Sequence, residues 1–204
     1  MLLNLKKCTP NAMVLGELGR VPLEFNTKCR MLGFWYSMVT DNNNKISCIM
    51  YKLLINLHCS NLYKSEWVST LFAILRECGM NEYLNNTELV QNTNFAAFKK
   101  LYKDNLMQLY KDNWLNTIEV SSKCSLYRNF KDDPKLEKYL FVLPKHLSLP
   151  LTRLRTSNHR MPIETGRYLN VERKDRICML CTSNDIGDEY HYCMCCPYFE
   201  NLRK

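Results

Sequence analysis

A chain of 204 residues, 46% of them hydrophobic, is long enough to bury a core, and its composition excludes wholesale disorder. No apolar run reaches the 18 residues of a membrane-spanning helix, and the lysines close behind Met1 are wrongly placed for a secretory signal. The net charge is +8, and residues 145–176 alone hold eight cations against three carboxylates.

Long helices are expected between Pro22 and Pro134, because no proline interrupts this stretch. The first predicted helix covers residues 23–40, and the Asp- and Asn-rich residues 41–44 form a loop. The clearest helical periodicity follows, with apolar residues spaced by three and one at Ile46, Ile49, Met50, Leu53, Leu54 and Leu57.

Further helices follow along the chain. Ser65 is a suitable N-cap for a helix that stops near Gly79, and a longer helix covers about residues 95–118. Strand signals are sparse. We therefore predict a mostly α fold, an irregular helical array over residues 1–134 followed by a small zinc-binding module.

Residues 135–204 are predicted to form a basic helical approach and then a zinc-binding tail. A short helix is expected from Ser148 to about Ser157, with Leu151 and Leu154 facing inward, and Gly166 offers a turn.

The tail differs from the rest of the chain in its high cysteine content. Eleven cysteines without a secretory signal argue against a disulfide framework and for an intracellular protein, in nucleus or cytoplasm. Six are scattered singly, as small buried hydrophobic residues often are, and the other five crowd into residues 178–196.

The spacing in the tail is typical of a structural zinc site. Cys178 and Cys181 form a C-x2-C pair that one tight turn presents to a single ion. His191 follows on a short helix that is expected to start at Gly187 and Asp188. A fourth protein ligand would close the coordination sphere, so we expect a structural Zn²⁺ rather than a catalytic one.

Two cysteines compete to be the fourth ligand. On a regular α-helix Cys195 lies about 40° around the axis from His191, and Cys196 lies about 140° away. Pro197, however, pushes the residue before it out of the α conformation, so that Cys196 can turn toward the metal. This argument favours Cys196 and leaves Cys195 as its rival.

The tail and its approach resemble a known family. The residues concerned are LTRLR at 151–155, NH at 158–159, IETGRY at 163–168, RIC at 176–178, DEYH at 188–191, CP at 196–197 and LR at 202–203. Over about residues 136–204 this pattern closely resembles the C-terminal end of non-LTR (LINE-type) retrotransposon proteins, downstream of their reverse transcriptase. A weaker likeness, GELGRVPL at 16–23, is similar to the helical segment beyond the polymerase thumb.

The resemblance implies a function for the tail. In the family the Cys-Cys-His-Cys cluster is a zinc-binding module beside the polymerase, where it grips RNA or DNA. The resemblance also favours Cys196 over Cys195, because the family's last ligand precedes the proline. The missing polymerase domain would be a possible partner.

We expect no catalysis from this chain itself. Reverse transcriptases place paired aspartates on a strand turn to hold two metal ions. Asp132 and Asp133 imitate that pair, but they lie in a lysine-rich stretch before Pro134 without flanking β-branched strands. The chain is therefore predicted not to be an enzyme.

Basic residues before the tail are candidates for binding a nucleic-acid backbone, because cations bind phosphate and aromatic rings stack on unpaired bases. About half of these residues are expected instead to attach the tail to the helices through carboxylates such as Glu164, Glu172 and Glu189. The candidates are Arg153, Arg155, Arg160, Arg167, Tyr168, Arg173, Lys174 and Arg176, of which Arg173, Lys174 and Arg176 are the better phosphate ligands.

The sequence thus predicts a non-catalytic fragment that binds RNA or DNA largely without regard to base sequence, and that binds no membrane. The alternative is a zinc-stabilised helical module that binds another protein. An exposed apolar surface on residues 45–76 would favour the alternative, and a continuous basic face over residues 145–176 would favour nucleic acid.

Overall fold

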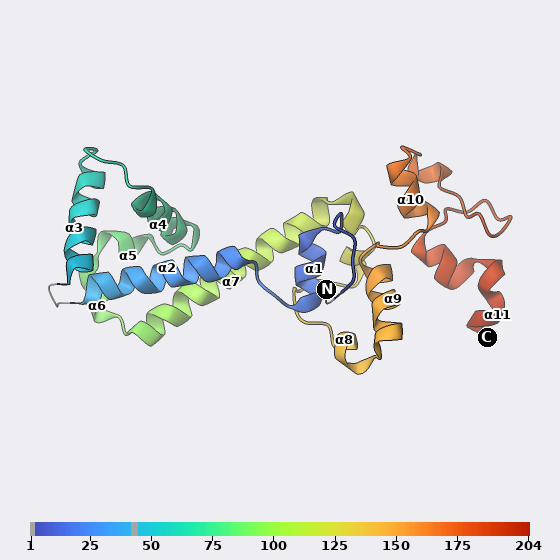
Figure 1. Cartoon of the computed structure of the whole chain (residues 1–204), viewed down its shortest axis with the longest axis horizontal. Coiled ribbons are helices and arrows are strands. Elements are labelled where there is room, and N and C mark those ends of the chain that lie inside the picture. The colour runs from blue at the N-terminus through green and yellow to red at the C-terminus, as the bar shows by residue number, and fades with distance from the viewer. Residues whose placement is uncertain (1–2, 42–44) are drawn as a thin grey trace. The chain divides into compact units, whose positions relative to one another are not determined.

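The computed structural model describes residues 3–41 and 45–204, and these residues are largely helical (Figure 1). Their single β feature is an isolated antiparallel bridge between Ile177 and Ile186. The mostly α prediction is confirmed. None of the described helices is both long enough and apolar enough to cross a bilayer.

The helices follow one another along the whole chain, with the shorter ones concentrated after residue 120. In chain order they are α1 (Asn11–Leu18), α2 (Leu23–Thr40), α3 (Ile46–Cys59), α4 (Glu66–Glu77), α5 (Asn81–Asn85), α6 (Thr87–Asn92), α7 (Phe95–Val120), η1 (Ser122–Cys124), η2 (Tyr127–Asn129), α8 (Tyr139–Val142), α9 (Lys145–Arg155), α10 (Pro162–Tyr168), η3 (Arg173–Asp175), η4 (His191–Cys195), η5 (Pro197–Phe199) and α11 (Glu200–Arg203).

The chain folds as two compact units. The central unit is Val21–Asn113, and the terminal unit combines Met1–Arg20 with Trp114–Lys204. The boundary that the sequence suggested, at residue 134, lies inside the terminal unit. The reason is that α1 packs against the end of α7, where the Trp114 indole donates a hydrogen bond to the Ala12 carbonyl oxygen at 2.8 Å. A contact between residues that are about a hundred positions apart cannot be predicted from the local composition of the sequence.

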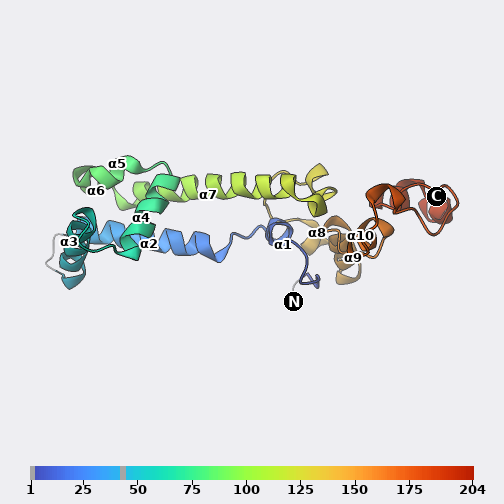
Figure 2. The same ribbon diagram turned by 90° about the horizontal axis from the view of Figure 1, so that it is seen from above.

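The central unit is built around α2 and the first part of α7, which lie side by side in both views (Figures 1 and 2). The Phe98 ring stacks on Tyr36, with 5.0 Å between centroids, and also contacts Trp35 at 5.9 Å. The predicted helix starts are confirmed, because α2 begins directly after Pro22 and the Ser65 hydroxyl, as an N-cap, accepts the Val68 amide at 3.5 Å. Burial of large rings stabilises this unit.

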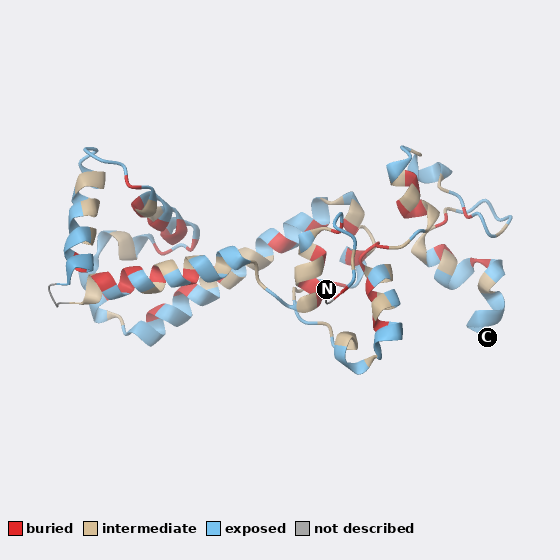
Figure 3. Cartoon of the chain, in the orientation of Figure 1, coloured by how far each residue is buried: buried red, intermediate tan, exposed pale blue. Residues whose placement is uncertain are grey.

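The periodic segment after residue 45 forms α3 as predicted, but four of the six residues of its apolar stripe are exposed, and only Leu54 and Leu57 are half-buried. Ile46 is 79% exposed, and Ile49 and Leu53 are about half exposed, whereas Cys48 is buried. Figure 3 shows α3 mostly in the colours of exposed and intermediate residues. Of the predicted loop at 41–44, only Asp41 lies within the described residues, where it ends α2.

Two glycines in the terminal unit allow close packing of α1. A Cβ at Gly16 would lie 2.6 Å from the Tyr127 hydroxyl, and Gly19 ends α1 with a positive φ of 57°. Only glycine adopts that conformation without strain. The GELG sequence at 16–19 therefore has a structural reason.

The two helices before the tail differ from prediction. α9 begins at Lys145, directly after Pro144, three residues before the predicted start at Ser148, so that Pro150 lies in the helix interior rather than near its start. Its buried residues are Ser148 and Thr152, while Leu151 and Leu154 are half-buried and line a surface pocket.

Gly166 was expected in a turn but lies inside α10, a helix that starts with Pro162. The side chain of Arg176 crosses this glycine so closely that a Cβ would lie 2.6 Å from its Cγ. Gly166 therefore serves close packing rather than chain reversal.

Candidate metal centre

The four predicted ligands come together in the terminal unit. The ligand atoms of Cys178, Cys181, His191 and Cys196 all lie within 4.8 Å of one another. The sulfurs of Cys178 and Cys196 are 3.9 Å apart, and the Cys181 sulfur is 3.3 Å from His191 Nε2. Neighbouring ligands of a tetrahedral zinc ion lie about 3.5–3.8 Å apart, given bond lengths of about 2.0–2.3 Å. The arrangement and the donor set therefore fit a four-coordinate metal ion.

The first two ligands are held by a narrow loop. The Ile177–Ile186 bridge closes it, and the Cys178 amide donates to the Asp185 carbonyl oxygen at 2.8 Å. The Leu180 amide points back at the Cys178 sulfur, 3.4 Å away. Gly187 has no room for a side chain, because a Cβ there would lie 3.1 Å from the Cα of Cys178.

The last two ligands flank one turn of π-helix, η4, because His191 begins it and Cys196 directly follows it. The Asp188 carboxylate accepts the His191 amide at 2.9 Å, which caps the turn near the predicted helix start. The Cys196 amide then donates to the His191 carbonyl oxygen at 2.7 Å, the i to i+5 bond of a π-turn.

This π-turn decides between the rival cysteines. The i to i+5 hydrogen bond brings the backbone of Cys196 beside His191, and the Cys196 sulfur joins the cluster. Cys196 has left the helical conformation, with φ −59° and ψ 119°, as the proline after it requires. Cys195 and Cys193 are exposed and outside the cluster.

Hydrogen bonds inside the cluster favour the thiolate form of Cys178. Burial by itself raises the pKa of this thiol, but hydrogen bonds from the Leu180 backbone, Tyr192 and Cys181 outweigh it and lower the pKa to about 6. The thiolate is the form that binds metal ions.

A carboxylate lies behind the histidine ligand. His191 Nδ1 is 3.6 Å from a carboxylate oxygen of Asp185, and His191 Nε2 faces the cysteine sulfurs. A carboxylate in this position orients a metal-bound imidazole and increases its basicity.

Three of the eight candidate nucleic-acid residues have their charged groups engaged inside the protein. Arg155 forms an ion pair with the fully buried Glu17 at 3.0 Å. Arg167 pairs with Glu164 at 3.1 Å and bonds Ser122. Arg176, one of the favoured phosphate candidates, donates instead to the carbonyl oxygens of Ile163 and Val171 at 2.8–3.0 Å.

The remaining candidates are exposed. The Tyr168 ring is 61% exposed, while its hydroxyl lies 3.3 Å from the Cys8 sulfur. Lys174 forms a solvent-exposed pair with Glu172 at 3.0 Å. Arg153, Arg160 and Arg173 also lie at the surface. Of the predicted basic group, four cations are thus available to a ligand.

Sequence reasoning missed two participants, Glu17 and Lys6. Glu17 neutralises Arg155 across 138 residues of sequence, and Tyr139 donates a second hydrogen bond to it. Lys6 lines the same pocket as Arg153 and Arg160. Neither residue carries a local signal, although the likeness at 16–23 did include Glu17.

No family model, curated protein or solved structure matches this chain.

Proposed function

We propose that this chain is a non-catalytic module that binds RNA or DNA through its phosphates and is held together by one structural zinc ion. The zinc part is supported by the three sulfurs and one imidazole nitrogen at tetrahedral spacing. The ion would lock the loop of Cys178 and Cys181 to the turn of His191 and Cys196. Four protein ligands leave no open position for a substrate.

The observation that carries the nucleic-acid part is the group of exposed cations on the same unit, namely Arg153, Arg160, Arg173 and Lys174. The resemblance to the C-terminal end of LINE-type retrotransposon proteins supports this reading and an origin in such a protein. Free thiols at all eleven cysteines fit a reducing, intracellular location.

The proposed absence of catalysis is supported by the surroundings of the acidic pair. Asp133 forms an ion pair with Lys135 at 2.6 Å, and Asp132 is exposed. Both follow η2 in irregular backbone rather than a strand turn. Primer extension by this chain with Mg²⁺ and nucleotides should therefore give no product. If the wild-type chain did extend a primer, and Asp132→Asn abolished that activity, the proposal would be overturned.

The proposed binding to nucleic acid is tested by measuring how the binding constant depends on salt concentration. If about three to five phosphates are neutralised, the logarithm of the binding constant should fall against the logarithm of salt concentration with a slope of about −2 to −4.5. Replacing Arg153, Arg160, Arg173 and Lys174 by Gln should flatten the slope by about one unit for each lost phosphate contact. All base sequences should be affected alike, because phosphate contacts carry no base information.

A matched control removes the same charge from the central unit, where Lys52, Lys64, Lys100 and Lys103 are also exposed. That variant should keep the wild-type slope. Equal flattening in both variants would mean that net charge alone attracts nucleic acid.

The exposed stripe of α3 favours a second function, binding to another protein. Ile46, Ile49, Met50 and Leu53 are all at least 47% exposed, and Phe34 of α2 is 54% exposed. Apolar patches of this kind often mark interfaces. Light scattering of the wild type and of Ile49→Lys/Leu53→Lys is the first test, because self-association that the double variant abolishes would identify the stripe as an interface.

A further inference from the structure

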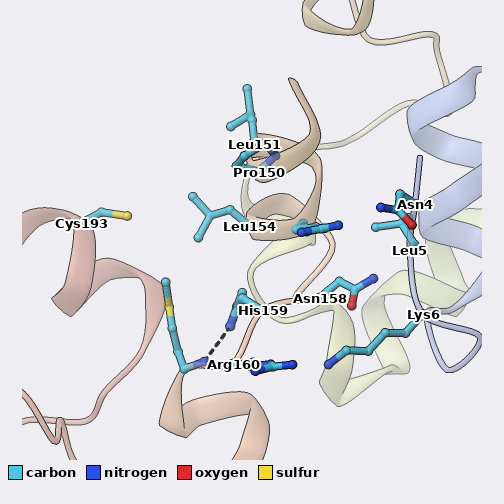
Figure 4. A pocket seen from close by; sticks show the side chains of 12 residues that line it. Asn4, Leu5, Lys6, Pro150, Leu151, Leu154, Asn158, His159, Arg160 and Cys193 are labelled. Atoms are coloured by element: carbon cyan, nitrogen blue, oxygen red, sulfur yellow. Dashed lines mark hydrogen bonds between the residues drawn. The ribbon is translucent and has the colours of Figure 1, made fainter. Parts of the chain in front are cut away.

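A pocket of about 850 Å³ opens on the terminal unit beside the metal centre. Its walls are residues 4–6, α9, residues 158–161, and Cys193 of the turn that carries His191 (Figure 4). Pockets for small-molecule ligands fall in the range of about 300–1,000 Å³.

The charge of this pocket is of one sign. Lys6, Arg153 and Arg160 line it, and no carboxylate does. Within residues 3–41 and 45–204, none of these three cations forms an ion pair. Figure 4 shows the Lys6 and Arg160 side chains pointing toward one another. A cleft that gathers like charges concentrates counter-ions, so an anion is the expected occupant.

Much of the remaining lining is apolar, although Asn4, Asn158 and His159 also contribute to it. Leu151 and Leu154 of α9, together with Met161, give the pocket a surface that a lone inorganic anion would not need. A ligand with both a flat apolar part and a negative charge uses both features. A nucleotide has this combination in its base and its phosphate.

The wall at residues 158–161 is held in place. His159 Nδ1 accepts the Met161 amide at 3.3 Å, so its Nε2 carries the proton and donates to Glu189 at 2.8 Å. The Asn158 amide donates to Thr9 at 3.2 Å. Since Glu189 lies two residues before His191, this wall is tied directly to the metal module.

We propose that this pocket binds one unpaired nucleotide of a nucleic-acid strand. Its phosphate lies on Lys6, Arg153 and Arg160, and its base lies against Leu151, Leu154 and Met161. The inference rests on the proposed function and adds a preference for single strands, because a base in a duplex must be flipped out of its stack before it can enter a pocket.

The test compares two charge-matched variants of the full chain. Arg153→Gln/Arg160→Gln removes charge from the pocket, and Arg173→Gln/Lys174→Gln removes the same charge outside it. Binding to a labelled single strand of about 12 nucleotides, and to the duplex of the same sequence, is measured at one fixed salt concentration. The pocket variant should weaken single-strand binding about tenfold or more and duplex binding about threefold, whereas the control should weaken both about equally.

A third variant tests the apolar part without changing charge. Leu154→Trp fills the pocket and should remove the preference for the single strand while leaving duplex binding unchanged. A nucleoside monophosphate should shift the NMR signals of the Arg153 and Arg160 guanidinium groups more strongly than inorganic phosphate at equal concentration. Equal shifts would show that the pocket takes a bare anion, against the inference.

The two proposals fail in different ways. A wild-type protein that binds neither strand nor duplex, even at low salt, overturns both. Salt-dependent binding that the pocket variant and its control weaken equally overturns the pocket and leaves the proposed function standing. Retained zinc and an unchanged circular dichroism spectrum verify that each variant is folded.

Discussion

The two compact units of this chain are stabilised by different interactions. The central unit has an apolar core around Trp35, Leu71 and Phe98, and Ser65 is the one buried polar residue described there. The terminal unit buries Glu17 and His191 together with other polar side chains, namely Thr9, Lys131, Ser148, Thr152, Thr156, Ser157, Asn158 and Glu164.

The two kinds of interaction differ in how strictly they fix the position of each side chain. Hydrophobic burial is non-directional, so many apolar side chains of similar size can maintain the central unit. A buried carboxylate or metal ligand needs one particular partner at one distance, since an unpartnered polar group is costly to bury. The terminal unit therefore depends on single residues, and it is the unit that holds the candidate site.

The largest expected effect is the loss of a metal ligand in the terminal unit. Purified wild-type protein should contain about one zinc per chain, and Cys178→Ser or His191→Ala should lose it. The tail from residue 176 onward should then lose its amide-exchange protection, because metal binding and folding are coupled in small modules. The central unit should keep its protection, as hydrogen exchange followed by mass spectrometry will show.

The matched controls are Cys195→Ser and Cys193→Ser, which should keep their zinc. Loss of zinc from Cys195→Ser with retention in Cys196→Ser would show that a regular α-helix, rather than the π-turn, prevails in solution. Protein prepared without chelator and found free of metal would contradict the zinc proposal as a whole.

In the central unit the largest effect should come from Phe98→Ala. Phe98 is fully buried and contacts the rings of Tyr36, Trp35, Tyr83 and Tyr102. Its truncation should cost about 3–5 kcal/mol of unfolding free energy, measured by urea denaturation. Zinc content should stay at the wild-type value. A simultaneous loss of zinc would show that the two units do not fold independently.

Removal of the buried Glu17 carboxylate should lower the free energy of unfolding slightly less than Phe98→Ala does. Glu17→Ala leaves the Arg155 guanidinium half-buried without its main partner, which typically costs about 3 kcal/mol. Leu18→Ala is a control on the same helix, because Leu18 is only partly buried. A Glu17→Ala protein as stable as this control would mean that water replaces the ion pair.

The smallest effect concerns the helix cap. Ser65→Ala should destabilise the central unit by about 0.5–1 kcal/mol, toward the low end for an N-cap because the hydrogen bond to Val68 is long at 3.5 Å. Ser65→Asp should restore most of this loss, since aspartate also caps helices. A Ser65→Asp variant no more stable than Ser65→Ala would argue against capping.

Local sequence patterns predicted where the helices lie better than they predicted what each helix packs against. The helix after Pro22, the cap at Ser65 and the helical period from Ile46 were all read from neighbouring residues, and the structure has each of them. The periodicity did not tell which way α3 faces, because an apolar stripe specifies a helix and not its partner. The predicted inward position of Leu151 and Leu154 failed for the same reason.

The candidate metal ligands are the part of the site that could be predicted from the sequence, apart from the choice between Cys195 and Cys196. Cys178, Cys181, His191 and Cys196 lie within 19 residues, so that local structure brings them together, namely a tight turn and the π-turn before Pro197. The arginines were decided only by the tertiary structure. Arg155 and Arg153 are two residues apart on α9, yet one meets Glu17 from the distant α1 and the other faces the pocket. Which cation is neutralised depends on long-range packing, because a charge interacts with whatever lies near it in space and not in sequence.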